Sequence, residues 1–198
     1  LRFARARHPR LAEAHRYVII EASETLRGRQ RARLDPLSAP VRWAESLGAL
    51  PPEGITGCIL TNELLDALPV HRVEMTAEGL REILVGLRDG EMADALGPLS
   101  TPEIADHFAR VGTAPPPGAQ AEVGLEAVSW YRAAAARLAE GALITVDYGD
   151  VAAGLYTASR PRGTLLCYYR HGTNEEPYRR VGTQDITAHV DFTALMQA

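Results

Sequence analysis

The stretch TGCILTNELLDALPVHRVEM, residues 56–75, passes within a few positions from an apolar run into a group of polar side chains. Residues 58–60 are typical of a buried strand, and Pro69 interrupts the leucine pattern that follows them. Two carboxylates and an amide lie between: Asn62, Glu63 and Asp66. A short helix starting near Asn62 would place these three on one face and turn Leu64 and Leu68 toward the core.

Length and composition indicate one packed soluble domain, or one domain with an insertion. The chain has 198 residues, an apolar fraction of 46% and a formal charge of −4. The negative charge gives no basic footprint for nucleic acid, and the apolar runs fall well below the roughly 20 residues that span a bilayer. We therefore expect neither a nucleic-acid partner nor membrane insertion.

The residues that often hold metals or form disulfides show no such pattern. Cys58 and Cys167 lie in apolar, strand-like runs and are expected to be small buried side chains, which fits a reducing, cytoplasmic location. Four histidines share no zinc-binding spacing: His71, His107, His171 and His189. The sequence therefore favours chemistry without a metal.

Strand-like runs alternate with helical ones along the chain. Strands are predicted at residues 16–22, 41–43, 57–61, 142–147 and 163–171. Helices are predicted at residues 1–14, 24–34 and 127–141, with a last one near the end of 184–198. Ser23 and Asp191 are the expected N-caps of the second and last helices, and Gly141 is the expected stop of the third.

An insertion is expected after the strand at residues 57–61. Residues 70–87 fit a hairpin, because two β-rich runs flank the turn at 76–79, and residues 110–124 read as a proline-stiffened loop. The alternation as a whole predicts an α/β protein in which helices cover both faces of a parallel sheet.

Ligands of such sheets bind beyond the carboxyl ends of the strands. Polar residues follow four predicted strands: Glu21, the segment 45–47, the pair Asn62 and Glu63, and the segment 147–149. An acid after the second strand of a nucleotide-binding unit accepts hydrogen bonds from a ribose, about 20 residues beyond a glycine-rich loop. Counting back from Glu21 places that loop before Leu1. The plainer alternative makes Glu21 a solvated loop residue.

The segment TNELLDALPVHRVEM resembles the N-E-hydrophobic-hydrophobic-D-A-L-P-V-H motif of the MidA-like S-adenosylmethionine-dependent methyltransferases. The similarity continues at VIIEASETLRGRQRARL, GALITVDYG, GTLLCYYRH and QDITAHVDFTAL. Mitochondrial members of this family are complex I assembly factors that dimethylate an arginine of a partner subunit. The resemblance implies a Rossmann-like class I methyltransferase fold with a mostly parallel sheet, helices on both faces and an inserted β-hairpin.

The resemblance also implies a domain organisation. Residues 1–198 would form an incomplete methyltransferase domain that lacks the first strand and the glycine loop, and residues 70–120 would be a hairpin-and-loop insertion on the substrate side. By itself, such a chain is expected to be inactive. The implied partner is a protein that presents an arginine, and a homodimer stays open.

Carried over position by position, the resemblance implies S-adenosylmethionine as cofactor and a role for each site residue. Glu21 would bind the ribose, and Ser46 and Leu47 would lie beside the adenine. Asn62 and Glu63 would lie at the methyl-donor end. Glu63 and Asp66 are the candidate catalytic pair, because two carboxylates can hold the planar fork of a guanidinium. Apart from the resemblance, His71 follows Pro69 at the base of the predicted hairpin, where it could line the substrate side or be a surface or core histidine.

Alternatives remain for these residues and for the function. Glu63 and Asp66 could be ordinary acids in the first turn of a helix, worth about 0.3–1 kcal/mol each with its dipole. Tyr148 and Gly149 could wall the cofactor pocket or form a turn, and segments 170–171 and 185–187 are read as bracing. The chain could be a non-catalytic protein-binding module of the same fold, while a nicotinamide dehydrogenase is a weaker reading based on Glu21 alone.

Overall fold

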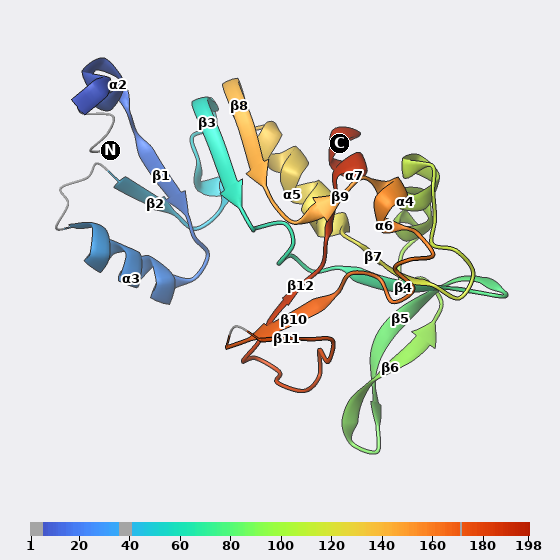
Figure 1. The fold of residues 1–198 in the computed structure, drawn as a ribbon. Coiled ribbons are helices and arrows are strands. Elements are labelled where there is room, and N and C mark those ends of the chain that lie inside the picture. Colours follow the sequence, from blue (N-terminus) through green and yellow to red (C-terminus); the bar gives the residue numbers. More distant parts are fainter. Residues whose placement is uncertain (1–5, 36–40, 171) are drawn as a thin grey trace. The chain divides into compact units, whose positions relative to one another are not determined.

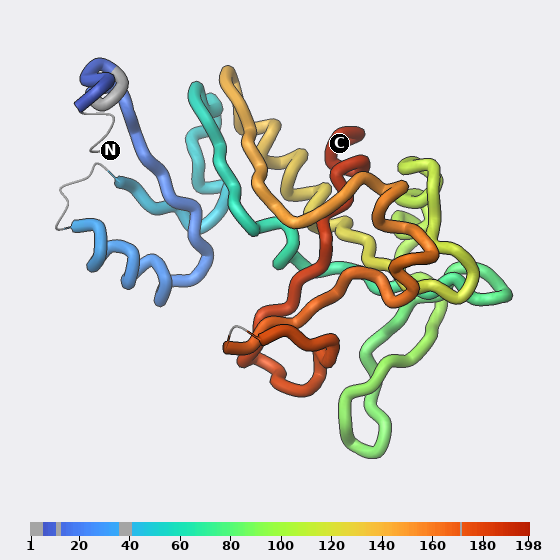
Figure 2. The backbone as a smooth tube through the Cα atoms, in the orientation of Figure 1, coloured from blue at the N-terminus to red at the C-terminus, as the bar shows by residue number. Residues whose placement is uncertain are grey.

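The computed structural model describes residues 6–35, 41–170 and 172–198, apart from the side chains of Leu11 and Ala12. The chain forms two compact units (Figures 1 and 2). The first unit comprises residues 1–57 and 136–141, and the second comprises residues 58–135 and 142–198. None of the helices in the described ranges is long and apolar enough to cross a membrane.

The first unit contains one β-α-β arrangement. Strand β1 (Tyr17–Ile20) pairs in parallel with β2 (Val41–Ala44), and α3 (Glu24–Leu34) lies between them in the sequence. Ser23 caps α3 by accepting a hydrogen bond from the backbone N–H of Leu26, which confirms the predicted cap. The short helix α2 (Pro9–Ala14) precedes β1. Residues 1–5 of the helix predicted at 1–14 lie outside the described residues.

Strands β3 (Ile55–Asn62) and β8 (Leu138–Val146) pair with each other. The backbone N–H of Ile55 bonds the carbonyl of Arg137 at one end, and that of Glu63 bonds the carbonyl of Val146 at the other. Both strands therefore run in the same direction, as β3 and β8 do in Figure 1. The acidic segment after β3 consequently lies at the carboxyl end of a parallel pair.

The predicted helix stop at Gly141 is wrong. Helix α5 (Leu125–Ala135) ends six positions earlier, and Gly141 lies inside β8 with a φ of 135°. A Cβ at this position would come within 1.8 Å of the carbonyl oxygen of Gly57. The glycine is thus required by the close approach of two strands, a tertiary demand that overrides the helical pattern of residues 136–140.

The insertion is larger than a hairpin. Its antiparallel sheet has the order β6-β5-β4-β7: β6 (Glu91–Gly97), β5 (Gly79–Arg88), β4 (His71–Thr76) and β7 (Gln120–Val123). The predicted hairpin is confirmed as β4–β5, where Gly79 takes a φ of 113° opposite Thr76. The loop predicted at 110–124 is wrong over β7, because β7 pairs with β4 in a contact that local sequence does not reveal. Helix α4 (Glu103–Val111) was also not predicted.

The remainder of the second unit consists of short elements. They are β9 (Gly149–Asp150), α6 (Ala152–Leu155), β10 (Leu166–Tyr169), β11 (Gly172–Asn174), β12 (Asp185–Thr187), β13 (Val190–Asp191) and α7 (Phe192–Met196). Asp191 caps α7 through the N–H of Ala194, as predicted. His171 lies outside the described residues.

The two cysteines differ in environment. Cys167 in β10 is fully buried, in agreement with the sequence. Cys58 is exposed, so the prediction of a second buried cysteine is wrong. The burial pattern of β3 accounts for this, since only two of its eight residues are buried.

Two apolar clusters form the core of the second unit. The first joins the inserted sheet to α4 and α6 and contains Val73, Ile104, Phe108, Ala121, Val123, Ala152, Leu155 and Tyr156. The second joins the segment after β3 to α5 and α7 and contains Leu65, Ala127, Val128, Val190, Ala194 and Leu195. The second cluster fixes the base of the candidate site.

Candidate functional site

The segment that begins at the last residue of β3, residues 62–68, is called the acid loop below. It contains no helix, so the predicted helical start near Asn62 is wrong. Glu63 instead takes a φ of 49°, in the left-handed region, and the N–H of Leu68 bonds the carbonyl of Leu65 in a turn. Without a helix, Asn62, Glu63 and Asp66 do not share a helical face. Glu63 and Asp66 are also not acids in the first turn of a helix.

Burial separates the side chains of the acid loop. Leu65 lies in the core with 2% of its surface exposed, and Leu64 and Leu68 pack against the same cluster. Asp66 is also buried, with 5% exposed, whereas Asn62 and Glu63 are exposed. The backbone carbonyl of Asp66 accepts a hydrogen bond of 2.9 Å from the N–H of Ala188. The loop thus presents one exposed and one buried carboxyl group.

The electrostatic environment of Asp66 is unfavourable to a negative charge. Burial, and then the neighbouring charges of Asp147 and Glu63, raise the pKa of Asp66 to about 6. Its Oδ1 atom is buried without a hydrogen-bond partner. No ion pair of the described chain involves any of these three acids. Among the residues that the structure describes, no cation therefore pairs with this site.

The raised pKa of Asp66 predicts how stability depends on pH. Between about pH 4 and 6 the folded state holds a proton that the unfolded state has lost, so the free energy of unfolding should fall as the pH rises. We compare the free energy of unfolding of the Asp66→Asn variant with that of the unchanged protein. The difference should shift in favour of the variant by about 2 kcal/mol between pH 4.5 and pH 8. Urea unfolding of both proteins at the two pH values measures this gain. Parallel stability curves would contradict the raised pKa.

Asp147, which follows β8, contacts the acid loop directly. Its Oδ2 atom accepts hydrogen bonds from the backbone N–H groups of Leu64, at 3.2 Å, and Leu65, at 2.9 Å. Its Oδ1 atom accepts one of 2.9 Å from the N–H of Tyr148. The sequence marked Asp147 only as a polar residue at a strand end. Its two partners in the acid loop are backbone groups more than 80 positions away, which leave no sequence signal.

The residues predicted to bind the nucleoside lie in the first unit. Glu21 follows β1, and Ser46 and Leu47 follow β2, so the parallel pairing places them beyond the carboxyl ends of neighbouring strands. Glu21 accepts hydrogen bonds from the N–H of Ser23, at 2.9 Å, and from the side chain of Gln30, at 3.2 Å. Each carboxylate oxygen has a second lone pair, which leaves acceptor capacity for a ribose.

His71 is held by the inserted sheet. Its Nδ1 atom lies 2.7 Å from Oε1 of Glu82, whose other oxygen accepts a short hydrogen bond from the N–H of Ser100. Glu82 is buried, and these partners lower its pKa despite the opposing effect of burial. The side chain of His71 is 33% exposed. Its imidazole is therefore oriented but accessible, and its substrate-side role stays a prediction.

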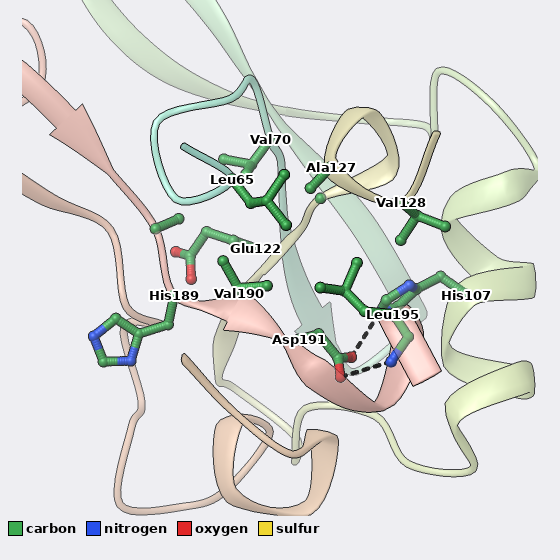
Figure 3. Close-up of a pocket in the computed structure, with 13 residues that line it drawn as sticks. Leu65, Val70, His107, Glu122, Ala127, Val128, His189, Val190, Asp191 and Leu195 are labelled. Atoms are coloured by element: carbon green, nitrogen blue, oxygen red, sulfur yellow. Dashed lines mark hydrogen bonds and ion pairs between the residues drawn. The ribbon is translucent and has the colours of Figure 1, made fainter. Parts of the chain in front are cut away.

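A small pocket lies beneath the acid loop (Figure 3). Leu65, Val128 and Leu195 supply apolar lining, and His107 and Asp191 lie together at one side, with 3.3 Å between Nε2 and Oδ2. Asp191 is also the N-cap of α7, and Tyr156 donates a hydrogen bond to it. The polar groups at this side therefore brace the C-terminal helix. Within the described ranges, no group of three or more His, Cys, Asp or Glu residues could hold a metal ion.

The fold and the comparison with a family model define the class of protein. Residues 1–198 match the family model described as "Putative S-adenosyl-L-methionine-dependent methyltransferase", and the chain belongs to this family. The family resemblance and S-adenosylmethionine as the family's cofactor are thereby confirmed. The α/β, Rossmann-like fold is confirmed by the solved relatives.

Particular relatives make the comparison more specific. The mitochondrial protein arginine methyltransferase NDUFAF7 of Bos taurus is 32% identical over 169 residues, which cover 79% of this chain and 33% of that protein. Its counterpart from Danio rerio is 29% identical over 163 residues, covering 79% of this chain and 35% of that protein. The chain thus spans about a third of the length of these relatives.

Two crystal structures from Burkholderia thailandensis are also similar. One, bound to S-adenosyl-homocysteine, is 37% identical with a TM-score of 0.79 and covers 91% of this chain and 46% of that one. The other, a native structure, is 37% identical with a TM-score of 0.82 and covers 92% of this chain and 48% of that one. The chain spans about half the length of each.

Proposed function

We propose that this chain is the part of an S-adenosylmethionine-dependent methyltransferase that holds the substrate, and that the substrate is an arginine of a partner protein. One observation carries the proposal. The acid loop places the carboxyl groups of Glu63 and Asp66 near that of Asp147, with a buried, unpartnered oxygen on Asp66 and no neutralising cation among the described residues. A cationic group is the natural complement of such a site.

The chemistry of the guanidinium group fits this arrangement. Its N–H donors form a planar fork that a carboxylate can accept bidentately, so the exposed Glu63 would grip one edge. A cation would also favour the ionised form of Asp66, whose unpartnered oxygen would then gain a donor. Two charge-assisted contacts would fix the plane of the group and leave one nitrogen free to approach the methyl donor.

The transfer itself needs no covalent intermediate with the protein. A nitrogen lone pair forms a bond to the methyl carbon as the bond from that carbon to the sulfonium sulfur breaks. The sulfur leaves with the electron pair as neutral S-adenosylhomocysteine, and the nitrogen then gives up a proton. Glu63 and Asp66 would orient the nitrogen and offset the positive charge, so positioning and electrostatics would supply the rate.

The relatives support both halves of the proposal. NDUFAF7, 32% identical to this chain in the bovine case, is named a protein arginine methyltransferase. The relative that is 37% identical was solved with S-adenosyl-homocysteine, the product that such a transfer leaves behind. The geometry of Glu21 after β1 supports a nucleoside-binding role in this chain. A homodimer and a cytoplasmic location stay predictions.

The test is to identify the methylated residue. The full-length protein is incubated with S-adenosylmethionine carrying a labelled methyl group and with a protein extract from cells that lack the gene, and labelled peptides are sequenced by mass spectrometry. We expect label on arginine in a protein that is unmethylated in the deletion cells and methylated in the parent cells. Label on another residue type would overturn the arginine assignment, and no label at all would favour the non-catalytic binding module.

Cofactor binding gives a separate prediction. We expect the 198-residue chain to bind S-adenosylmethionine more weakly than a chain extended toward its amino terminus, because the backbone amides of a glycine-rich loop would hold the methionine part of the cofactor. Calorimetric titration of both chains measures the difference. Equal affinities would contradict the placement of the glycine loop before Leu1.

A further inference from the structure

The acid loop is held in an unusual conformation. The backbone φ angle of Glu63 is 49°, which lies in the left-handed region. Residues other than glycine seldom occupy this region. Directly after it, the chain turns so that Leu65 enters the core and Asp66 is buried. A loop of this kind keeps its shape only where its surroundings over-determine it.

The strongest of those surroundings is the carboxylate of Asp147. It accepts the N–H groups of Leu64 and Leu65 through a single oxygen, Oδ2, at 3.2 Å and 2.9 Å. These are the two backbone donors that directly follow Glu63. Its other oxygen is engaged by the N–H of Tyr148 at 2.9 Å, which fixes the carboxylate at the end of β8. Hydrogen bonds to an ionised acceptor are the stronger kind.

We propose that Asp147 is the positioning residue of the methyltransferase site: it fixes the backbone after Glu63 and thereby aims Glu63 and Asp66 at the substrate, without touching the substrate itself. This inference rests on the proposed function for its catalytic consequence. The positioning of the loop can be tested on its own.

The geometry requires a carboxylate rather than an amide. An asparagine at position 147 offers one acceptor oxygen, while its NH₂ group can only donate. If that oxygen faced Leu64 and Leu65, the NH₂ group would face the N–H of Tyr148, and a flipped amide would face the loop with donors instead. Either way, at least one backbone donor loses its acceptor. Burial raises the pKa of Asp66 most, and one of the two neighbouring charges that raise it further is lost as well.

The experiment compares the Asp147→Asn variant with the unchanged protein by NMR. We expect the amide hydrogens of Leu64 and Leu65 to exchange at least about 10-fold faster in the variant. We also expect the Asp66 carboxyl group to titrate at lower pH, since a neighbouring negative charge has gone. Unchanged exchange and an unchanged Asp66 titration would overturn the proposal, whatever the activity of the variant.

Two further variants sharpen the comparison. Asp150→Asn removes another carboxylate that binds a backbone N–H just beyond β8, and it should leave the Leu64 and Leu65 amides unaffected. Asp147→Glu keeps two acceptor oxygens, so the amides of Leu64 and Leu65 should retain most of their protection from exchange. If Asp147→Asn does not fold, the unchanged protein still tests the proposal, because the amides of Leu64 and Leu65 must be protected from exchange by their bonds to Asp147. Fast exchange of both amides would overturn it.

The activity arm separates this inference from the proposed function. In the full-length protein, Asp147→Asn should reduce kcat for methyl transfer about 10-fold and leave the dissociation constant of S-adenosylmethionine unchanged. If the unchanged protein transfers no methyl group to arginine, the proposed function fails, yet the exchange and titration results still decide the positioning role. If Asp147→Asn shows faster amide exchange in the acid loop but an unchanged kcat, the positioning role stands and only its proposed effect on catalysis is refuted.

Discussion

The Glu63→Gln variant of the full-length protein is expected to lose at least about 30-fold in methyl transfer to an arginine-bearing protein, corresponding to about 2 kcal/mol or more. Glutamine preserves the size of the side chain and one acceptor oxygen but removes the charge that would pair with the guanidinium. The affinity for S-adenosylmethionine should change little, so the loss should appear in the transfer step or in substrate binding. Methyl incorporation measures the transfer, calorimetry measures the affinity for S-adenosylmethionine, and the melting temperature measures the stability of the variant.

Two further variants serve as comparisons for Glu63→Gln. Asp66→Asn should show a weaker form of the same loss, because Asp66 is buried whereas Glu63 is exposed. Glu78→Gln changes an exposed glutamate at the β4–β5 turn and should leave methyl transfer intact. Turnover of Glu63→Gln within about twofold of the unchanged protein would refute the catalytic role of the acid loop.

The Gly141→Ala variant is expected to lose about 3–5 kcal/mol in the free energy of unfolding. Two costs add. The φ of 135° is strained for any residue with a side chain, and the new Cβ would lie 1.8 Å from the carbonyl oxygen of Gly57. The clash is with backbone, so no rotamer change can relieve it, and β3 and β8 would have to separate. Urea unfolding of the two proteins measures the loss.

Gly28→Ala is the matched control for Gly141→Ala. Gly28 lies in α3, and a Cβ built there meets nothing within 4 Å. The same substitution should therefore stabilise the protein slightly, by about 0.5–1 kcal/mol, since alanine favours helix more than glycine does. If Gly141→Ala unfolds within about 1 kcal/mol of the unchanged protein, the close approach of the two strands is not as the structure has it.

The parts of the fold that local chemistry decides could be predicted from the sequence. Ser23 and Asp191 cap helices as expected, because a short side chain that accepts a nearby N–H leaves a local signature. The β4–β5 hairpin was found from its turn. Strand β7 was missed because its reason for being extended is its partner β4, about fifty positions earlier in the chain. Gly141 was misread for the same reason, since the strand that needs it lies at Gly57.

The candidate site shows the same division. The position of Glu63 and Asp66 after a strand could be read from the alternation of apolar and polar residues, and the structure places them at the end of β3. Their geometry could not be read, because a helical pattern of leucines predicted a helix where the chain forms an irregular loop. The conformation of that loop depends on Asp147, and the choice among its backbone partners is made only in the folded protein.

The bond from the N–H of Ala188 to the carbonyl of Asp66 has a consequence for protein engineering. The acid loop also bonds to residues 146 and 147. Its shape therefore depends on hydrogen-bond partners that lie far away in the chain. A cassette of residues 61–70 transplanted into another scaffold would carry the carboxyl groups but not their arrangement. Any transferable unit must include the carboxyl ends of β3 and β8 and the segment just before α7.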